Sequence, residues 1–200
     1  MRLRNIVAIS APMSSSIANA YIDFSKMTST VVAVRVALPD GKPDVIGYGF
    51  NSNGRYSAKS LMDERFIPRL LEASPESLID EEGFLCPFEC WDKMMTNEKP
   101  GGHGERSVAV GTLDMALWDA LSKAKGVPLF RLISDRYNGG KCDESVSVYA
   151  AGVVCSLTSS EPPHSCYDFF QADIISPERA LRASGRKCKV ILIEATRMSR

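Results

Sequence analysis

Short apolar runs dominate the first fifty residues, and their spacing is typical of β-strands. Apolar and β-branched side chains gather in residues 3–11, 30–38 and 45–50. Asp40 and Gly41 stand between the second and third runs, and an Asp-Gly pair favours a tight hairpin turn. The pattern therefore predicts three consecutive strands in an antiparallel meander.

The hydrophobic period then changes to a helical one. Residues 58–72 carry an apolar stripe, which predicts a helix that Pro68 can kink or break. Residues 87–96 form a shorter helical candidate. Its apolar positions are Phe88, Trp91, Met94 and Met95.

The most strongly patterned stretch is residues 111–131, GTLDMALWDALSKAKGVPLFR. It predicts a helix from about Glu105 to Lys125 that is buried on most of its circumference. Gly126 and Pro128 follow as a C-terminal stop. Strands followed by helices form the α+β pattern, so we expect a three-stranded antiparallel meander followed by a helical bundle.

The rest of the chain has a weaker pattern. A polar linker leads to residues 145–151, which are strand-like. From Val153 onward no amphipathic pattern is long enough to complete a domain, and we expect this part to be poorly ordered. The predicted organisation is a domain over residues 1–135, a linker and a further strand over 136–152, and an irregular tail over 153–200.

Composition narrows the classes of function. The 200 residues are 44% hydrophobic and 24% charged, with a formal net charge of zero. These values are typical of a soluble globular protein and give no sign of a nucleic-acid or membrane partner. No apolar run approaches the roughly 20 residues that cross a bilayer. The six cysteines lack the dense spacing of a disulfide framework, so we expect reduced thiols in a cytoplasmic protein.

Lys99 is the first candidate for a binding residue. It stands in the segment NEKPGGHGER, residues 97–106, where a lysine and three glycines precede a helix. Flexible N–H groups, the positive end of the helix dipole and an ammonium group together suit an anion such as a carboxylate. From the residues alone, a plain loop at a helix start explains the same pattern.

Asn53 and Asn19 belong to two further polar loops. Asn53 follows the third strand in GYGFNSNGR, residues 47–55, where amide groups can meet a hydroxylated ligand. Asn-Gly is also common turn chemistry, which is the simpler explanation. The loop around Asn19 lies between two predicted strands and is a candidate lid.

The remaining polar clusters predict neither a catalytic nor a metal site. Asp119 stands four residues before Lys123, a spacing that favours an ion pair on one helix face. Cys86, Cys90 and His103 have no second pair of ligands to complete a tetrahedral zinc site.

Four segments resemble one known family: residues 17–24 (IANAYIDF), 47–55, 97–112 and 148–152 (VYAAG), together with the helix over 111–131. Through them the first 152 residues resemble the capping domain of the enolase superfamily, in its mandelate racemase and muconate lactonizing enzyme branch. More narrowly, the resemblance is to the D-tartrate dehydratase group. The helix is general to the family, whereas the two loops with Asn53 and Lys99 are typical of acid-sugar dehydratases.

The resemblance implies Mg²⁺-dependent dehydration of a small hydroxy-diacid. A base removes the proton beside a carboxylate, Mg²⁺ stabilises the enediolate, and an acid assists the departure of hydroxide. The resemblance also implies that the capping domain closes over the mouth of a β/α barrel, whose first strand would be residues 148–152. Asn19, Asn53 and Lys99 match the positions that contact the substrate.

From Val153 onward the sequence departs from the family pattern, which would place a Lys-x-Lys base and three acidic metal ligands there. We therefore expect a truncated acid-sugar dehydratase that is catalytically inactive, with no catalytic residue and no ligand for Mg²⁺. The alternative is a module that binds a small diacid, or that associates with itself or with an intact homologue.

Overall fold

The computed structural model describes residues 1–15, 21–101, 104–143 and 145. Contacts divide the chain into two units, Met1–Cys142 and Asp143–Arg200, and nearly all described residues belong to the first. The predicted strand over residues 145–151 lies outside the described residues apart from Ser145, as does the whole tail. The predicted domain limits at residues 135 and 152 therefore stay predictions.

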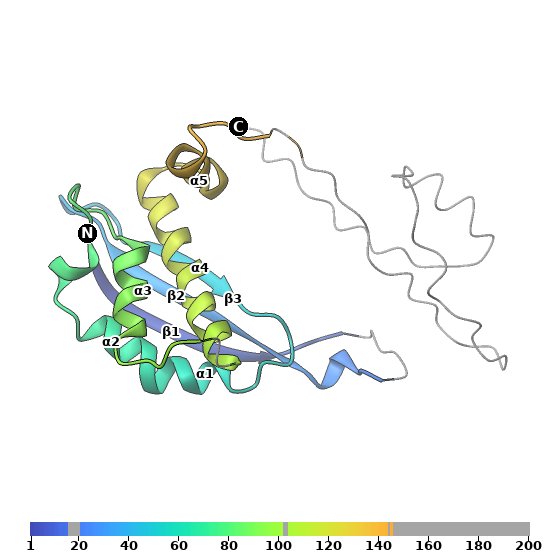
Figure 1. The fold of residues 1–200 in the computed structure, drawn as a ribbon. Helices are drawn as coiled ribbons and strands as arrows, with labels where there is room; N and C mark the ends of the chain where they lie inside the picture. Colours follow the sequence, from blue (N-terminus) through green and yellow to red (C-terminus); the bar gives the residue numbers. More distant parts are fainter. Residues whose placement is uncertain (16–20, 102–103, 144, 146–200) are drawn as a thin grey trace, which may run out of the picture. The chain divides into compact units, whose positions relative to one another are not determined.

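Three strands form one antiparallel sheet in the order β1-β2-β3, which confirms the predicted meander (Figure 1). Asp40 and Gly41, in the connection between β2 and β3, both have positive φ (61° and 69°), as the central residues of a type I′ turn require. The strand bounds are Arg2–Pro12 for β1, Thr28–Ala37 for β2 and Val45–Phe50 for β3.

The helices follow the sheet in sequence, which confirms the predicted α+β class. α4 has the bounds predicted from its pattern, and Gly126 ends it in the left-handed conformation with φ 66°. α5 is a further helix that the sequence pattern does not single out. None of the described helices is long and apolar enough to cross a membrane. The helices are α1 (Ala58–Leu61), α2 (Ile67–Leu71), α3 (Pro87–Met95), α4 (Glu105–Lys125) and α5 (Leu129–Tyr137), with a π-helical turn η2 (Met62–Phe66) and 3-10 turns η1 (Phe24–Lys26) and η3 (Pro75–Leu78).

Pro68 does not break the helix in which it lies. A proline ring collides with the carbonyl four residues earlier, which belongs here to Glu64. The turn η2, which contains that carbonyl, is wound as a π-helix and is therefore wider than an α-helical turn. The predicted kink thus takes the form of a π-turn, and α1, η2 and α2 follow one another without a gap.

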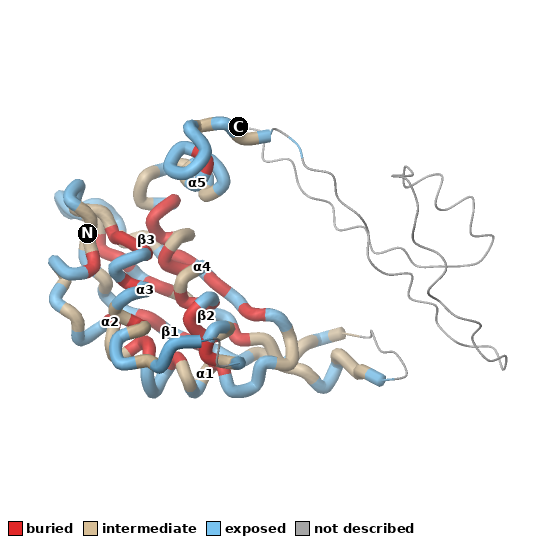
Figure 2. The backbone as a smooth tube through the Cα atoms, viewed as in Figure 1, coloured by how far each residue is buried: buried red, intermediate tan, exposed pale blue. Residues whose placement is uncertain are grey.

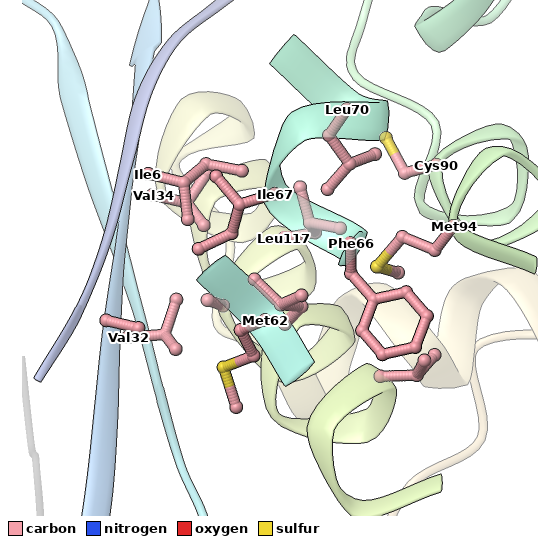
Figure 3. Close-up of a cluster of buried hydrophobic side chains, with 14 of the residues drawn as sticks. Ile6, Val32, Val34, Met62, Phe66, Ile67, Leu70, Cys90, Met94 and Leu117 are labelled. Carbon is pink, nitrogen blue, oxygen red and sulfur yellow. The ribbon is translucent and has the colours of Figure 1, made fainter. Parts of the chain in front are cut away.

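The core lies between one face of the sheet and the helices (Figures 2 and 3). On β2 the side chains at alternate positions, Val32, Val34 and Val36, are fully buried, while Val31 and Arg35 are exposed, as expected for a sheet covered on one side. The largest buried side chains on the helices are Met62, Phe66, Leu70, Met94, Leu113, Leu117 and Leu121.

The helix predicted over residues 87–96 is confirmed as α3, and its apolar residues divide between the core and the surface. Cys90 and Met94 face the core, whereas Phe88 and Trp91 are 48% and 45% exposed. The sequence identified the helix correctly, but an apolar side chain does not by itself show which face of a short helix is covered.

Candidate functional site

The ends of the three strands determine where the candidate loops lie. In an antiparallel meander, the end of β1, the start of β2 and the end of β3 lie at the same end of the sheet. Met13 N donates to Met27 O across the loop between β1 and β2 (2.9 Å). Gly54 N donates to Thr28 O (3.0 Å), so the loop after β3 lies against the start of β2.

The start of α4 reaches the same end of the domain (Figure 1). Gly49, near the end of β3, lies against Thr112, in the first half of α4. Arg55, in the loop after β3, forms an ion pair of 3.1 Å with Glu105, the first residue of α4. This ion pair joins the loop after β3 to the segment that leads from α3 into α4.

Two of the three predicted substrate contacts can therefore be placed. Asn53 is half-buried in the turn after β3, followed by Gly54 with φ 75°. Lys99 is exposed in the segment before α4, and its ammonium group has no hydrogen-bond or ion-pair partner among the described residues. Asn19 lies outside the described residues. The loops of Asn53 and Lys99 lie at one end of the domain, while the roles of all three residues stay predictions.

A buried carboxylate lies immediately before Lys99. The side chain of Glu98 is 7% exposed and is surrounded by three guanidinium groups. Arg69 Nη1 donates to it at 2.9 Å, Arg106 Nη1 at 3.2 Å, and Arg65 approaches at 3.4 Å. Arg65 and Arg69 belong to η2 and α2, whereas Arg106 belongs to α4. Glu98 therefore connects two helices through the segment between α3 and α4.

Arg106 also holds the backbone of this segment. Its side chain, 6% exposed, donates from Nη1 to the carbonyl of Lys99 (2.8 Å) and from Nη2 to the carbonyl of Gly101. Buried charges persist in proteins when they are paired and hydrogen-bonded, and here each partner satisfies the other. The backbone around Lys99 is fixed by this cluster, and the ammonium group is left for another partner.

The charges around Glu98 outweigh the effect of its burial. Burial raises the pKa of the Glu98 carboxyl, but hydrogen bonds from Arg69 and Arg106 and the charge of Arg65 lower it, and the net pKa lies below its usual value. Glu98 is therefore ionised at neutral pH. No sequence signal identified this cluster, because its members are separated along the chain and each is an ordinary surface residue type.

Asn51 is a second residue that the sequence reading missed. It is buried, and its Oδ1 accepts a hydrogen bond from Thr30 N at 2.8 Å, which extends the pairing of β2 with β3. Its Nδ2 is also buried and has no partner among the described residues. The loop after β3 thus contains an unused amide donor close to Asn53.

The predicted ion pair between Asp119 and Lys123 is confirmed, at 2.6 Å. Asp119 Oδ2 also accepts from Tyr48 N (2.7 Å), and Lys123 Nζ donates to Ile46 O (2.8 Å). Tyr48 and Ile46 lie on β3, an edge strand whose outer backbone groups lack a strand partner. This pair of side chains therefore binds α4 to the edge of the sheet and has a structural role.

The described residues contain no site that fits Mg²⁺. Nowhere in residues 1–15, 21–101, 104–143 and 145 do three histidine, cysteine or acidic side chains stand together as metal ligands. Cys86 and Cys90 are buried free thiols, and His103 lies outside the described residues. Any magnesium chemistry of the family would need ligands from another part of the protein.

Fold and site together define an α+β domain whose loops gather at one end, with a fixed lysine segment among them. The family model for the mandelate racemase/muconate lactonizing enzyme N-terminal domain matches residues 9–134. The chain therefore belongs to this branch of the enolase superfamily, and its described fold is that of the N-terminal capping domain.

The curated relatives carry the name of one dehydratase family. D-galactonate dehydratase family member RspA of Halomonas elongata is 33% identical over 98 residues, which cover 48% of this chain and 21% of the relative. D-galactonate dehydratase family member ManD of Chromohalobacter salexigens is 31% identical over 99 residues, 49% of this chain and 21% of the relative. The chain thus spans about a fifth of the length of these relatives. The predicted resemblance to the D-tartrate dehydratase group stays a prediction.

A mandelate racemase/muconate lactonizing enzyme-like protein from Rubrobacter xylanophilus is among the solved structures that are similar. It matches with 20% identity and a TM-score of 0.42, over 64% of this chain and 31% of that chain.

Proposed function

We propose that this domain is the substrate-reading cap of an acid-sugar dehydratase. Together with a β/α barrel, it closes the active site and contacts the end of the substrate remote from the reacting carbon. Lys99 binds a carboxylate there, and Asn53 and Asn19 supply amide hydrogen bonds. The observation that carries the proposal is the Glu98–arginine cluster, which fixes the backbone of Lys99 and leaves its ammonium group unpaired among the described residues.

The proposed ligand is a small hydroxy-diacid. A lysine ammonium is a point charge that suits a carboxylate, and a ligand with a carboxylate at each end has one for Lys99 and one for the reacting centre. D-galactonate, in contrast, is a monoacid. Titration with D-tartrate and with D-galactonate therefore distinguishes a diacid ligand from a monoacid ligand. The proposal predicts stronger binding of the diacid, and a clear preference for D-galactonate would contradict it.

Calorimetric titration of the 200-residue chain with D-tartrate tests the role of Lys99. A charge-assisted hydrogen bond contributes about 1.5–3 kcal/mol, so Lys99→Gln weakens binding at least about tenfold. Lys42→Gln is the matched control, because Lys42 is an exposed lysine in the connection between β2 and β3, at the opposite end of the strands. An equal loss of D-tartrate affinity in both variants would show that Lys99 is not part of the binding site.

We also propose that these 200 residues by themselves do not dehydrate acid sugars. The proposal is supported by the sequence after residue 152, which does not follow the family pattern for the base and the metal ligands. An assay of the purified chain with D-tartrate and Mg²⁺ is expected to show no turnover. Turnover that survives repurification would refute this part of the proposal.

An exposed aromatic surface favours a second candidate function, association with another protein. Phe88 on α3 contacts Trp118 on α4 and Tyr137 on α5 edge-to-face, with ring centroids 5.8 and 6.4 Å apart. The guanidinium of Arg136 lies 5.3 Å from the Phe88 ring centre, and Trp91 is exposed on the same helix as Phe88. Aromatic residues and arginine are enriched at protein interfaces.

A pull-down against a full-length homologue tests this candidate. Trp91→Ser is expected to weaken the association, whereas Tyr56→Ser, which changes an exposed aromatic residue in the loop after β3, leaves it unchanged. Absence of any association, or equal loss in both variants, would contradict the second candidate and leave the first untouched.

A further inference from the structure

An open pocket lies between the helical segment η2–α2 and the segment that leads into α4. Its volume is about 530 Å³, within the range of small-molecule sites. Four cationic side chains and only two carboxylates line it, so its lining has an excess of positive charge. The cations are Arg65, Arg69, Lys99 and Arg106, and the carboxylates are Glu98 and Glu105.

Most N–H groups of the two helical arginines are unused. A guanidinium carries five N–H donors. Arg65 approaches Glu98 through Nη1 alone, at 3.4–3.5 Å, and Arg69 uses Nη1 for both Glu98 and the carbonyl of Met94. The Nε and Nη2 groups of both arginines donate to none of the described residues. These free donors form planar forks, a geometry that suits the oxygens of a carboxylate or a phosphate.

The two guanidinium groups are also held in place before any ligand arrives. Arg65 and Arg69 are four residues apart on one helical segment and therefore lie on the same side of it. Both lie near the ring of Phe66, at 6.0 and 5.8 Å from its centre, and Phe66 is fully buried. A preorganised pair of arginines loses little conformational freedom when it binds an anion.

One further atom at the pocket lacks a partner. Glu105 pairs with Arg55 through Oε1, but its Oε2 is buried and has no hydrogen-bond partner among the described residues. A buried acceptor of this kind is satisfied by a hydroxyl or another donor. The lining thus offers donors for an anionic group, and one of its two glutamates has a buried oxygen without a partner in the described part of the chain.

We propose that this pocket binds a small oxyanion, with a carboxylate or phosphate group on the free donors of Arg65 and Arg69 and with Lys99 as a third cation. Glu98 and Arg106 stay paired beneath it. Because Arg106 also holds the carbonyl groups of Lys99 and Gly101, an anion bound here stabilises the segment that presents Lys99. The pocket shares Lys99 with the proposed substrate contact. Binding through Arg65 and Arg69 does not require the domain to cap a barrel, so different variants test the two proposals.

Titration of the 200-residue chain with inorganic phosphate and with citrate, at constant ionic strength, tests the pocket. Saturable binding of either probe supports the site, and the tighter one tells whether phosphate or carboxylate is preferred. Arg65→Gln is expected to weaken binding about tenfold. Arg35→Gln is the matched control, because Arg35 is an exposed arginine on β2 paired with Asp44, and it leaves binding unchanged.

A second variant distinguishes an anion site from a purely structural cluster. Glu98→Gln removes the carboxylate that competes for the arginines and is expected to tighten phosphate or citrate binding several-fold. No saturable binding of either probe, or equal loss in Arg65→Gln and Arg35→Gln, overturns the proposal. If D-tartrate binding depends on Lys99 but not on Arg65, the result supports the proposed function alone. If phosphate binds through Arg65 and D-tartrate does not bind at all, the result supports the anion pocket alone.

Discussion

Gly49→Ala tests whether α4 lies on β3 only because the strand has no side chain at that point. A Cβ at Gly49 would stand 2.2 Å from the carbonyl oxygen of Thr112 and 2.9 Å from the backbone nitrogen of Ala116. Ordinary contacts between non-bonded heavy atoms are about 3.5 Å, so the helix must retreat by about 1 Å. Both atoms belong to the backbone of α4, and no side chain can rotate away to relieve the collision.

The retreat loosens the packing of the whole helix. Leu113 and Leu117 on α4 are fully buried, and a gap of about 1 Å forfeits up to half of the dispersion energy of each contact. Overpacking substitutions cost about 1–3 kcal/mol, and we expect the upper end, about 3 kcal/mol, because the collision is with backbone. That is a large share of the roughly 5–15 kcal/mol by which domains are stable.

Urea unfolding of the full chain, followed by tryptophan fluorescence and far-ultraviolet circular dichroism, measures the change. Gly111→Ala is the matched control. Gly111 is exposed on α4 with no atom near its missing Cβ, so alanine there is expected to stabilise the domain by about 0.8–1 kcal/mol through helix propensity. If Gly49→Ala unfolds within about 0.5 kcal/mol of the unchanged chain, the close approach of α4 to β3 is not what holds the helix.

Three further expectations follow from the described contacts. The pKa of Glu98 lies below its usual value of 4.5, so the stability that its ionised form contributes is present above pH 4.5 and is lost as the pH falls through the folded-state pKa. The free energy of unfolding, measured from pH 7 to pH 3, should therefore depend less on pH in Glu98→Gln than in the unchanged chain. Identical pH profiles would contradict a stabilising role for the Glu98–arginine cluster. Burial, followed by the neighbouring Cys86, raises the pKa of the Cys90 thiol to about 12, and Cys86 is itself buried. Alkylation at pH 8 mapped by mass spectrometry should therefore spare both and, among the described cysteines, modify the half-buried Cys142; rapid labelling of Cys90 would show that its site is open. Asp119→Ala removes the acceptor of Tyr48 N and the ion-pair partner of Lys123, and it is expected to lower the free energy of unfolding in urea by about 1–2 kcal/mol. Asp63→Ala breaks the exposed ion pair with Lys59 and should lower the free energy of unfolding by less than about 0.5 kcal/mol.

The family assignment and the site have different supports. The family is shown by a match to residues 9–134, and the fold by the sheet and helices described above. The substrate contacts at Asn53 and Lys99 are proposals, because the matching relatives share only part of their length with this chain. The structure adds what the resemblance lacks, a physical reason why Lys99 is held where it is, namely the contacts of Glu98 and Arg106.

The sequence by itself determined most of the elements of this domain, although not α5. Strand alternation, the Asp40-Gly41 turn and the glycine stop at residue 126 are local signals, because backbone preferences and hydrophobic periods act over a few neighbouring residues. The three strands and the full extent of α4 were therefore predicted. The buried face of α3 was not, since it depends on what packs against the helix. Pro68 predicted a kink or a break, but not the π-helical form that the kink takes.

Only the tertiary structure decided how the candidate residues are supported. Glu98 is contacted by three arginines from separate elements, Arg65, Arg69 and Arg106. The spacing of these residues along the chain does not predict that they lie together. Gly47 and Gly49 lie within the strand that the sequence predicts, and only the structure shows that they are the points where α4 touches β3. Electrostatic and steric contacts act through space. The sequence therefore pointed to the Lys99 segment, whereas the arginine cluster that supports it and the pocket beside it are visible only in the tertiary structure.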